Sequence, residues 1–394
     1  MSSARRHYQG PAFLSGGFRP FFLFGSLFSG LSVLLWLPQF YGELELASRF
    51  APVDWHVHEL YFGFLPAIIT GFLFTAVPNW TGRMPIRGVP LLLLLLVWIA
   101  GRLAVSFSNL LDWRAVMMVD VSFLALIAIV IANEIIAGKN WRNLKVLLPV
   151  VLLVAANVGF HLEVHFDGVS DYSRRSAATA VIVLIMIIGG RVIPSFTRNW
   201  LTRENPGRLP VPFSRFDVAA ILIGFAAMAS WVIAPEANAT GLAMVIASGV
   251  HFARLARWAG DRTVRDSLVF ILHVSYFYVP FGFGLIAAAI LSGGVVPHLA
   301  GTHALGVGAA GGMTLSVMVR ASLGHTGQPL QASMTAKLLF MSVNCAAVAR
   351  IFAGLDLGPQ DMLIHAAGIF WMVAFIGFAT LFSRALLLPQ SRPG

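Results

Sequence analysis

Long, nearly uncharged runs of apolar residues repeat along the whole chain and are separated by short polar loops. A helix needs about 20 apolar residues to cross a hydrocarbon core roughly 30 Å thick. Windows of this length predict twelve membrane-spanning helices, near residues 20–41, 58–78, 89–108, 113–137, 144–163, 175–196, 216–234, 239–258, 265–291, 300–320, 333–353 and 361–387. The pattern therefore predicts an all-α membrane protein, with one polytopic domain over residues 1–394 and no inserted soluble domain.

The loops between these runs differ in charge, and the difference predicts how the chain is oriented. The N-terminus, with Arg5 and Arg6, and the even-numbered loops, with residues such as Arg83, Arg208 and Arg254, carry most of the Lys and Arg. The odd-numbered loops are acidic or sparsely charged. Because cytoplasmic loops carry the excess of Lys and Arg in membrane proteins, both termini and the even loops are predicted to be cytoplasmic.

Composition narrows the classes of protein and site that remain. Only 11% of the residues are charged, against about 25% in soluble domains, so the lipid bilayer is the expected surrounding. The net charge of +10 comes from basic residues in short loops, which fits membrane topology better than nucleic-acid binding. Cys345 is the single cysteine, which excludes an intramolecular disulfide, an iron–sulfur cluster and covalent haem attachment. Any metal must be held by histidine, methionine or oxygen ligands.

An internal repeat is one interpretation of similar segments at related positions. His58 and His303 share a sequence offset with Thr81-Gly82 and Thr326-Gly327. This match predicts four-helix repeat units near residues 20–137, 144–258 and 265–387. Chance similarity among apolar segments is the alternative of equal weight.

The run from Asp54 to Glu59 places two histidines and two carboxylates at the expected start of the second helix. Ionisable residues at this depth are costly unless they are paired or ligated, so we expect a site. Residues two apart on a helix point to nearly opposite faces, so His56 and His58 are predicted to do different jobs. Asp54 is expected to cap the helix, and Glu59 to orient an imidazole or accept a proton. A merely hydrogen-bonded interfacial histidine is the simpler alternative for either residue.

Other polar residues within the apolar runs fall into two groups by depth. The predicted outer group supplies metal ligands and arginines, namely His56, His58, His161, His303, Arg102 and Arg350. The predicted inner group contains His273, Tyr276, His325 and Arg191. Each arginine needs an anion, such as a carboxylate or a haem propionate, or must extend to the interface. Gly308 and Gly312 allow close approach of another helix or of a flat macrocycle.

Several of these motifs, in this order, resemble the NnrS family of bacterial membrane proteins. They are Trp55-His56-Val57-His58-Glu59, Thr75–Gly82, Gly189–Pro194, Leu272-His273 and Arg320–Gly327. The resemblance covers nearly the whole chain. It implies a twelve-helix protein of the bacterial cytoplasmic membrane that contains haem and copper and is associated with nitric oxide and nitrosative stress.

The leading functional hypothesis is therefore a haem b and copper protein that acts on nitric oxide, and nitric oxide reductase is the candidate enzyme class. His56, His58, His161 and His303 are the expected metal ligands, and they supply the number that a dinuclear centre needs, with one haem-ligating histidine and about three copper ligands. His273, His325 and the three arginines Arg102, Arg191 and Arg350 are the further candidates for haem binding. Glu59 and Tyr276 are the candidate proton carriers, and a quinol is one candidate electron donor. The alternatives are a nitric oxide-binding or metal-protecting protein without turnover, and a metal or solute transporter.

Overall fold

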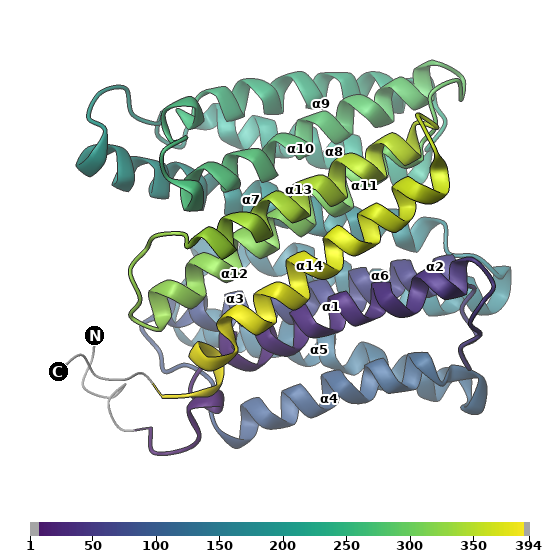
Figure 1. Ribbon diagram of the computed structural model, residues 1–394, viewed down its shortest axis with the longest axis horizontal. Coiled ribbons are helices and arrows are strands. Elements are labelled where there is room, and N and C mark those ends of the chain that lie inside the picture. Colours follow the sequence, from purple (N-terminus) through teal and green to yellow (C-terminus); the bar gives the residue numbers. More distant parts are fainter. Residues whose placement is uncertain (1–7, 390–394) are drawn as a thin grey trace. The chain divides into compact units, whose positions relative to one another are not determined.

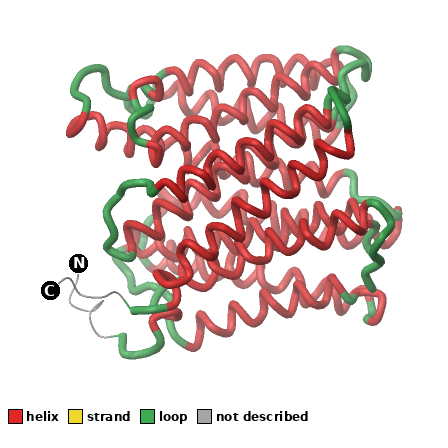
Figure 2. The backbone as a smooth tube through the Cα atoms, in the orientation of Figure 1, coloured by secondary structure: helices red, strands yellow, loops and turns green. Residues whose placement is uncertain are grey.

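The computed structural model describes residues 8–389, so Arg5, Arg6 and His7 lie outside the described residues. The chain is 80% helical, and helices and loops make up all of the described part, without a strand (Figure 2). Twelve helices within it are long and apolar enough to cross a membrane. The all-α, twelve-span prediction is confirmed, and the chain is a multi-pass membrane protein.

Figure 1 shows the order of the elements. The first part contains η2 (Ala12–Leu14), α1 (Phe18–Phe40), α2 (Pro52–His58), η3 (Glu59–Phe64), α3 (Leu65–Thr81), α4 (Val89–Ser106), η4 (Ser108–Leu110), α5 (Trp113–Ala137), η5 (Trp141–Val146) and α6 (Leu147–Asp167). The second contains α7 (Tyr172–Glu204), α8 (Arg215–Ile233), α9 (Asn238–Ala256), η6 (Gly260–Arg262), α10 (Ser267–Leu291), α11 (Leu299–His303), η7 (Ala304–Gly311), α12 (Gly312–His325), α13 (Met334–Gly354) and α14 (Gln360–Leu387).

The second span begins earlier than the apolar pattern predicted. Pro52 occupies the first helical position, where its missing N–H is not needed, and Ala51 is the N-cap. The predicted Asp54 cap is therefore wrong. Asp54 is buried, and its Oδ1 accepts a hydrogen bond from Ser170 Oγ at 2.5 Å.

Two of the spans change from α-helix to π-helix directly after a histidine. His58 is the last residue of α2 before η3, and His303 is the last residue of α11 before η7. A π-helical turn is rare and often accompanies a functional site, because it shifts the side chains that follow it around the helix. The π-helical turn that follows each histidine agrees with the sequence match between the second and tenth spans. The three-unit repeat stays a prediction.

The small residues of η7 and α12 serve helix packing. A Cβ atom added at Gly308 would lie 2.3 Å from the ring of Tyr278, and one at Gly312 would lie 2.7 Å from Ser275 Oγ. Both neighbours belong to α10, which packs against η7. The close approach predicted from these glycines is that of another helix rather than of a macrocycle.

The chain forms two compact units. Of the described residues, unit 1 comprises 8–174, 318–329 and 375–389, and unit 2 comprises 175–317 and 330–374. In unit 1, α1 packs on α3, and α5 packs on α3, α4 and α6. In unit 2, α9 packs between α8 and α10, and α11 and η7 pack on α10 and α13. The single-domain assignment stays a prediction.

The predicted orientation can be tested with single cysteines in a Cys345→Ala background. Val295 lies in the ninth loop and is 84% exposed, and Val264 lies in the eighth loop and is 62% exposed. We expect a membrane-impermeant maleimide to label Val295→Cys in intact cells and Val264→Cys only after permeabilisation, because loop charge places these loops on opposite sides. The reverse labelling pattern would contradict the orientation.

Candidate metal centre

A buried polar cluster lies inside unit 1, built from residues of five helical segments. His58 ends α2 and Glu59 begins η3, Arg102 lies on α4, Asp120 on α5, and Asn157 and His161 on α6. Asn157 and His161 are four residues apart, so they lie on the same face of α6, which packs on α5. Arg102, the most exposed of the six residues, is only 5% exposed.

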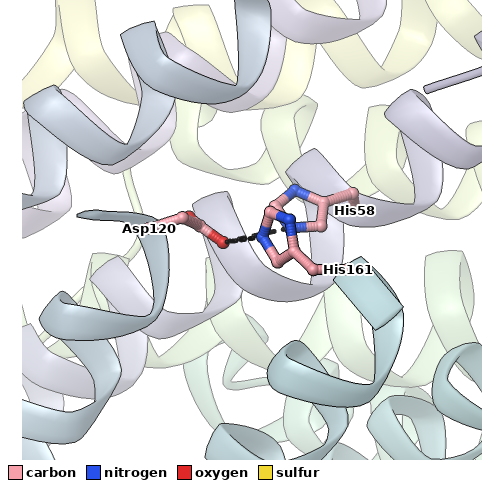
Figure 3. Close-up of side chains that lie close together, drawn as sticks. All are labelled: His58, Asp120 and His161. Carbon is pink, nitrogen blue, oxygen red and sulfur yellow. Dashed lines mark hydrogen bonds and ion pairs between the residues drawn. The ribbon is translucent and has the colours of Figure 1, made fainter. Parts of the chain in front are cut away.

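Asp120 is the residue on which the two histidines converge (Figure 3). Its Oδ2 lies 3.1 Å from His58 Nε2 and 3.0 Å from His161 Nε2. The same oxygen accepts a hydrogen bond from Asn157 Nδ2 at 2.9 Å. Asn157 Oδ1 also lies 3.1 Å from His58 Nε2, so the amide fixes both the carboxylate and the imidazole.

Arg102 connects the carboxylate of Glu59 to that of Asp120. Its Nη1 donates to Glu59 Oε2 at 2.8 Å, and its Nη2 donates to Asp120 Oδ1. Glu59 Oε1 lies 3.1 Å from His58 Nδ1, which closes a ring of contacts through His58, Glu59, Arg102 and Asp120. The two carboxylates supply the anions that the sequence led us to expect around Arg102.

Gly63 leaves the space that this arrangement needs. A Cβ atom at Gly63 would lie 2.6 Å from Arg102 Nη1 and 3.0 Å from Glu59 Oε2. The carbonyl oxygen of Gly63, which lies in η3, accepts a hydrogen bond from Trp98 Nε1 on α4 at 2.9 Å. The hydrogen bond thus holds the π-helical turn η3 against α4, close to the place where Arg102 of α4 reaches Glu59 of η3.

The surroundings of the cluster are apolar. The rings of Phe50, Phe62 and Phe160 lie with their centroids 5.0, 5.1 and 5.1 Å from that of His58. Charges in such surroundings are stable only when they are paired and hydrogen-bonded. Nδ1 of His58 faces Glu59, and its Nε2 faces Asp120 and Asn157, so both ring nitrogens have polar partners.

The donor atoms of this cluster suit a metal ion. Within residues 8–389, His58, Asp120 and His161 are the group of His, Cys, Asp and Glu side chains that could hold one ion, with ligand atoms within 4.8 Å of one another. Two imidazoles and one carboxylate are a donor set for copper, ferrous iron or zinc. Glu59 at His58 Nδ1 is the kind of outer partner that fixes the tautomer of a ligating imidazole.

The structure places His58, His161, Glu59 and Arg102 together, as the depth of these residues suggested. Two other predicted metal ligands, His56 and His303, make different contacts. The ring of His56 stacks on Trp36, with 4.1 Å between the centroids. His303 belongs to unit 2, where its Nε2 accepts a hydrogen bond from Arg350 Nη2 at 2.7 Å. The expected four-histidine cluster is therefore not assembled within either unit.

A second buried network occupies unit 2 and includes Tyr276. The Tyr276 hydroxyl accepts from Arg254 Nη1 at 2.8 Å and lies 2.9 Å from His251 Nδ1. Arg254 Nε donates to Asp217 Oδ1 at 3.1 Å, and the guanidinium is fully buried. Arg254 lies on α9 and not in a loop, so counting it among the loop charges was wrong.

The predicted haem residues are divided between the two units. His273 is buried on α10, and its Nε2 pairs with Thr197 Oγ1 at 2.8 Å. His325 ends α12 and is exposed, instead of lying in the following loop, with its ring 5.3 Å from that of Phe18 in unit 1. Arg191 lies half-buried on α7.

Sequence reasoning missed Asp120, Asn157's contact with His58, and the Asp217–Arg254 pair. Asp120 carried a usable signal, because it is an acid well inside an apolar run, where an unpaired carboxylate is costly. The contact between Asn157 and His58 carried none, since it depends on how α2 and α6 pack.

Comparison with known families agrees with the motifs. A family model described as NnrS protein matches residues 12–390. No match to a curated protein was found. The matched region contains every residue of the cluster.

Replacing Arg102 by methionine tests whether the cluster depends on its charge pairing. The change leaves two buried carboxylates without their cation, so we expect a loss of about 3–5 kcal/mol in the free energy of unfolding. Unfolding of the detergent-solubilised protein by denaturant measures it. The exposed Arg114→Met on α5 is the control, with an expected change within about 0.5 kcal/mol. Equal stability of the two variants would contradict the charge-pairing role.

Proposed function

The chain belongs to the NnrS family, and on that basis we propose that it is a haem- and copper-containing membrane protein that acts on nitric oxide. We assign the copper to His58, Asp120 and His161. The observation that supports this assignment is the convergence of two imidazoles and one carboxylate at a buried point within unit 1. Asn157, Glu59 and Arg102 would hold these donors in place.

Copper fits this donor set for two reasons. Imidazole nitrogen is a good ligand for copper, and unit 1 offers no thiolate, since the single cysteine, Cys345, belongs to unit 2. The carboxylate is already oriented by Arg102 and Asn157, so binding would require little rearrangement of Asp120. Bound copper would supply a centre able to exchange an electron.

The fit to haem is poorer, and we assign no step to it. His273 is the buried haem candidate, but Thr197 engages its Nε2. A Cβ atom at Gly260 would lie 2.5 Å from His273 Nδ1, so backbone covers the other nitrogen. The proposal of haem b therefore rests on family membership, with His273 and His325 as its candidate ligands.

The apolar walls of the site suit nitric oxide as the molecule acted on. Nitric oxide is small and weakly polar, so it can reach a buried centre from the bilayer without a hydrated channel. Phe50, Phe62 and Phe160 would exclude bulk water from the neighbourhood of His58. Glu59 contacts both His58 and Arg102, and Tyr276 contacts His251, so each could hold or move a proton within its own unit.

Reduction to nitrous oxide is the enzymatic form of the proposal. It would join two molecules of nitric oxide and consume two electrons and two protons, with release of water. A quinol or another donor in the cytoplasmic membrane would supply the electrons. The second candidate function is nitric oxide binding without turnover, which the burial of His58 among phenylalanine rings favours because binding needs neither an electron donor nor a supply of protons.

Metal content is the direct test of the assigned centre. We expect near-stoichiometric copper in the purified protein and its loss in His58→Ala, Asp120→Asn and His161→Ala, since each histidine change removes a donor and Asp120→Asn removes the charge of the third ligand. Copper, iron and zinc are quantified by mass spectrometry beside His165→Ala. That control removes an exposed histidine one turn further along α6. Retention of copper in all three ligand variants, or its loss in the control, would contradict the assignment.

Turnover separates the enzyme from the binding protein. We expect the purified protein with a reduced quinol to consume nitric oxide and release nitrous oxide, measured by gas chromatography. The activity should fall by at least about 100-fold in the His58→Ala variant and persist in His165→Ala. Binding of nitric oxide without nitrous oxide, for both quinol and dye donors, would overturn the reductase and support the binding protein.

A further inference from the structure

We propose that the cluster in unit 1 selects a monovalent metal ion over a divalent one, and that Glu59 and Arg102 set this selectivity without ligating the metal. This inference rests on the proposed function, because it concerns the metal centre formed by His58, Asp120 and His161. It goes further by naming the charge of the ion and the residues that determine it.

The fixed charges of the cluster add up to one negative charge when its histidines are neutral. Glu59 and Asp120 are two carboxylates, each bound to the guanidinium of Arg102. A histidine that binds a metal through one nitrogen is neutral. With His58 and His161 in that form, the two carboxylates and one guanidinium leave one negative charge. A monovalent ion therefore makes the centre neutral, whereas a divalent ion leaves one positive charge.

The difference in net charge between a monovalent and a divalent complex is costly because the site is buried. The side chains of Glu59 and Asp120 are fully buried, and that of Arg102 is 6% exposed. Phenylalanine rings surround His58, so little solvent is present to screen a leftover charge. An uncompensated charge in such a place is strongly unfavourable. The same excess on an exposed site would matter little.

The geometry separates the charge-setting residues from the ligands. Glu59 contacts His58 at Nδ1, while His58 Nε2 faces Asp120, so Glu59 approaches the ring from the side away from the other ligand atoms. Arg102 contacts Asp120 through Oδ1, which leaves Oδ2 toward His58 and His161. Substitution of Glu59 or Arg102 thus changes the charge of the centre while the donor atoms remain.

The chemical consequence is a preference for Cu(I), or for Ag(I) as a redox-inert substitute. Ferrous iron and Zn(II) share an affinity for two imidazoles and a carboxylate, so donor type alone does not separate them from copper. The net charge of the occupied site does separate the monovalent ions Cu(I) and Ag(I) from the divalent ions Fe(II) and Zn(II).

The test measures metal affinity of the full-length protein in detergent, after removal of metal, with Ag(I) and Zn(II) competing against chromogenic chelators. The variants are Glu59→Gln, which brings the fixed charge to zero, and Arg102→Gln, which brings it to two negative charges. Glu134→Gln removes a carboxylate outside the cluster, where Glu134 pairs with Arg83, and is the control.

We expect Glu59→Gln to weaken Ag(I) binding by at least about 100-fold and Arg102→Gln to raise the preference for Zn(II) over Ag(I) by a similar factor. The control should match the unmodified protein. If Arg102→Gln does not fold, the Glu59→Gln result decides alone. Metal binding that requires His58 and His161 but ignores Glu59→Gln would overturn the charge selection. Binding that survives His58→Ala and His161→Ala would instead overturn the proposed metal centre.

Discussion

The guanidinium of Arg102 between two buried carboxylates is the interaction on which the centre depends. Without it, Glu59 and Asp120 would be two like charges among phenylalanine rings, and neither could hold an imidazole in place. Arg102 can occupy this position because Gly63 has no side chain and because η3 brings Glu59 toward α4. The irregular turn, the glycine and the arginine therefore form one arrangement.

The polar network of unit 1 is suited to holding a metal ion, whereas that of unit 2 is suited to joining helices. In unit 1, Glu59 contacts His58 and Arg102 contacts Asp120. The possible ligand atoms of His58, Asp120 and His161, on α2, α5 and α6, converge. In unit 2, Arg254 donates to Asp217, to Tyr276 and to the carbonyl oxygen of Met186. His251 Nε2 donates to the carbonyl oxygen of Ala220 on α8, and its Nδ1 lies beside the Tyr276 hydroxyl on α10. That network joins α7, α8, α9 and α10, which makes it suited to holding those helices together.

Much of the fold followed from the apolar pattern, because a bilayer requires long uncharged helices and allows few other solutions. The site was only partly predictable. His58, His161, Glu59 and Arg102 could be identified because ionisable side chains inside apolar runs need partners. Their grouping with Asp120 rather than with His56 depended on helix packing and on the π-helical turn after His58, which the sequence pattern does not specify. Likewise, α7 continues for eight residues, 197–204, beyond the predicted span, and these residues are too polar for a hydropathy window to include.

The central claim is that a metal ion lies between His58 and His161, supported by Asp120. An experimental density map of the copper-loaded protein, with anomalous scattering recorded at the copper edge, tests it most directly. We predict a copper peak within bonding distance of His58 Nε2, His161 Nε2 and an oxygen of Asp120, with Glu59 and Arg102 outside the coordination sphere. A copper peak beside His303 or His273, with the ring of contacts around Arg102 unchanged and without metal, would contradict it.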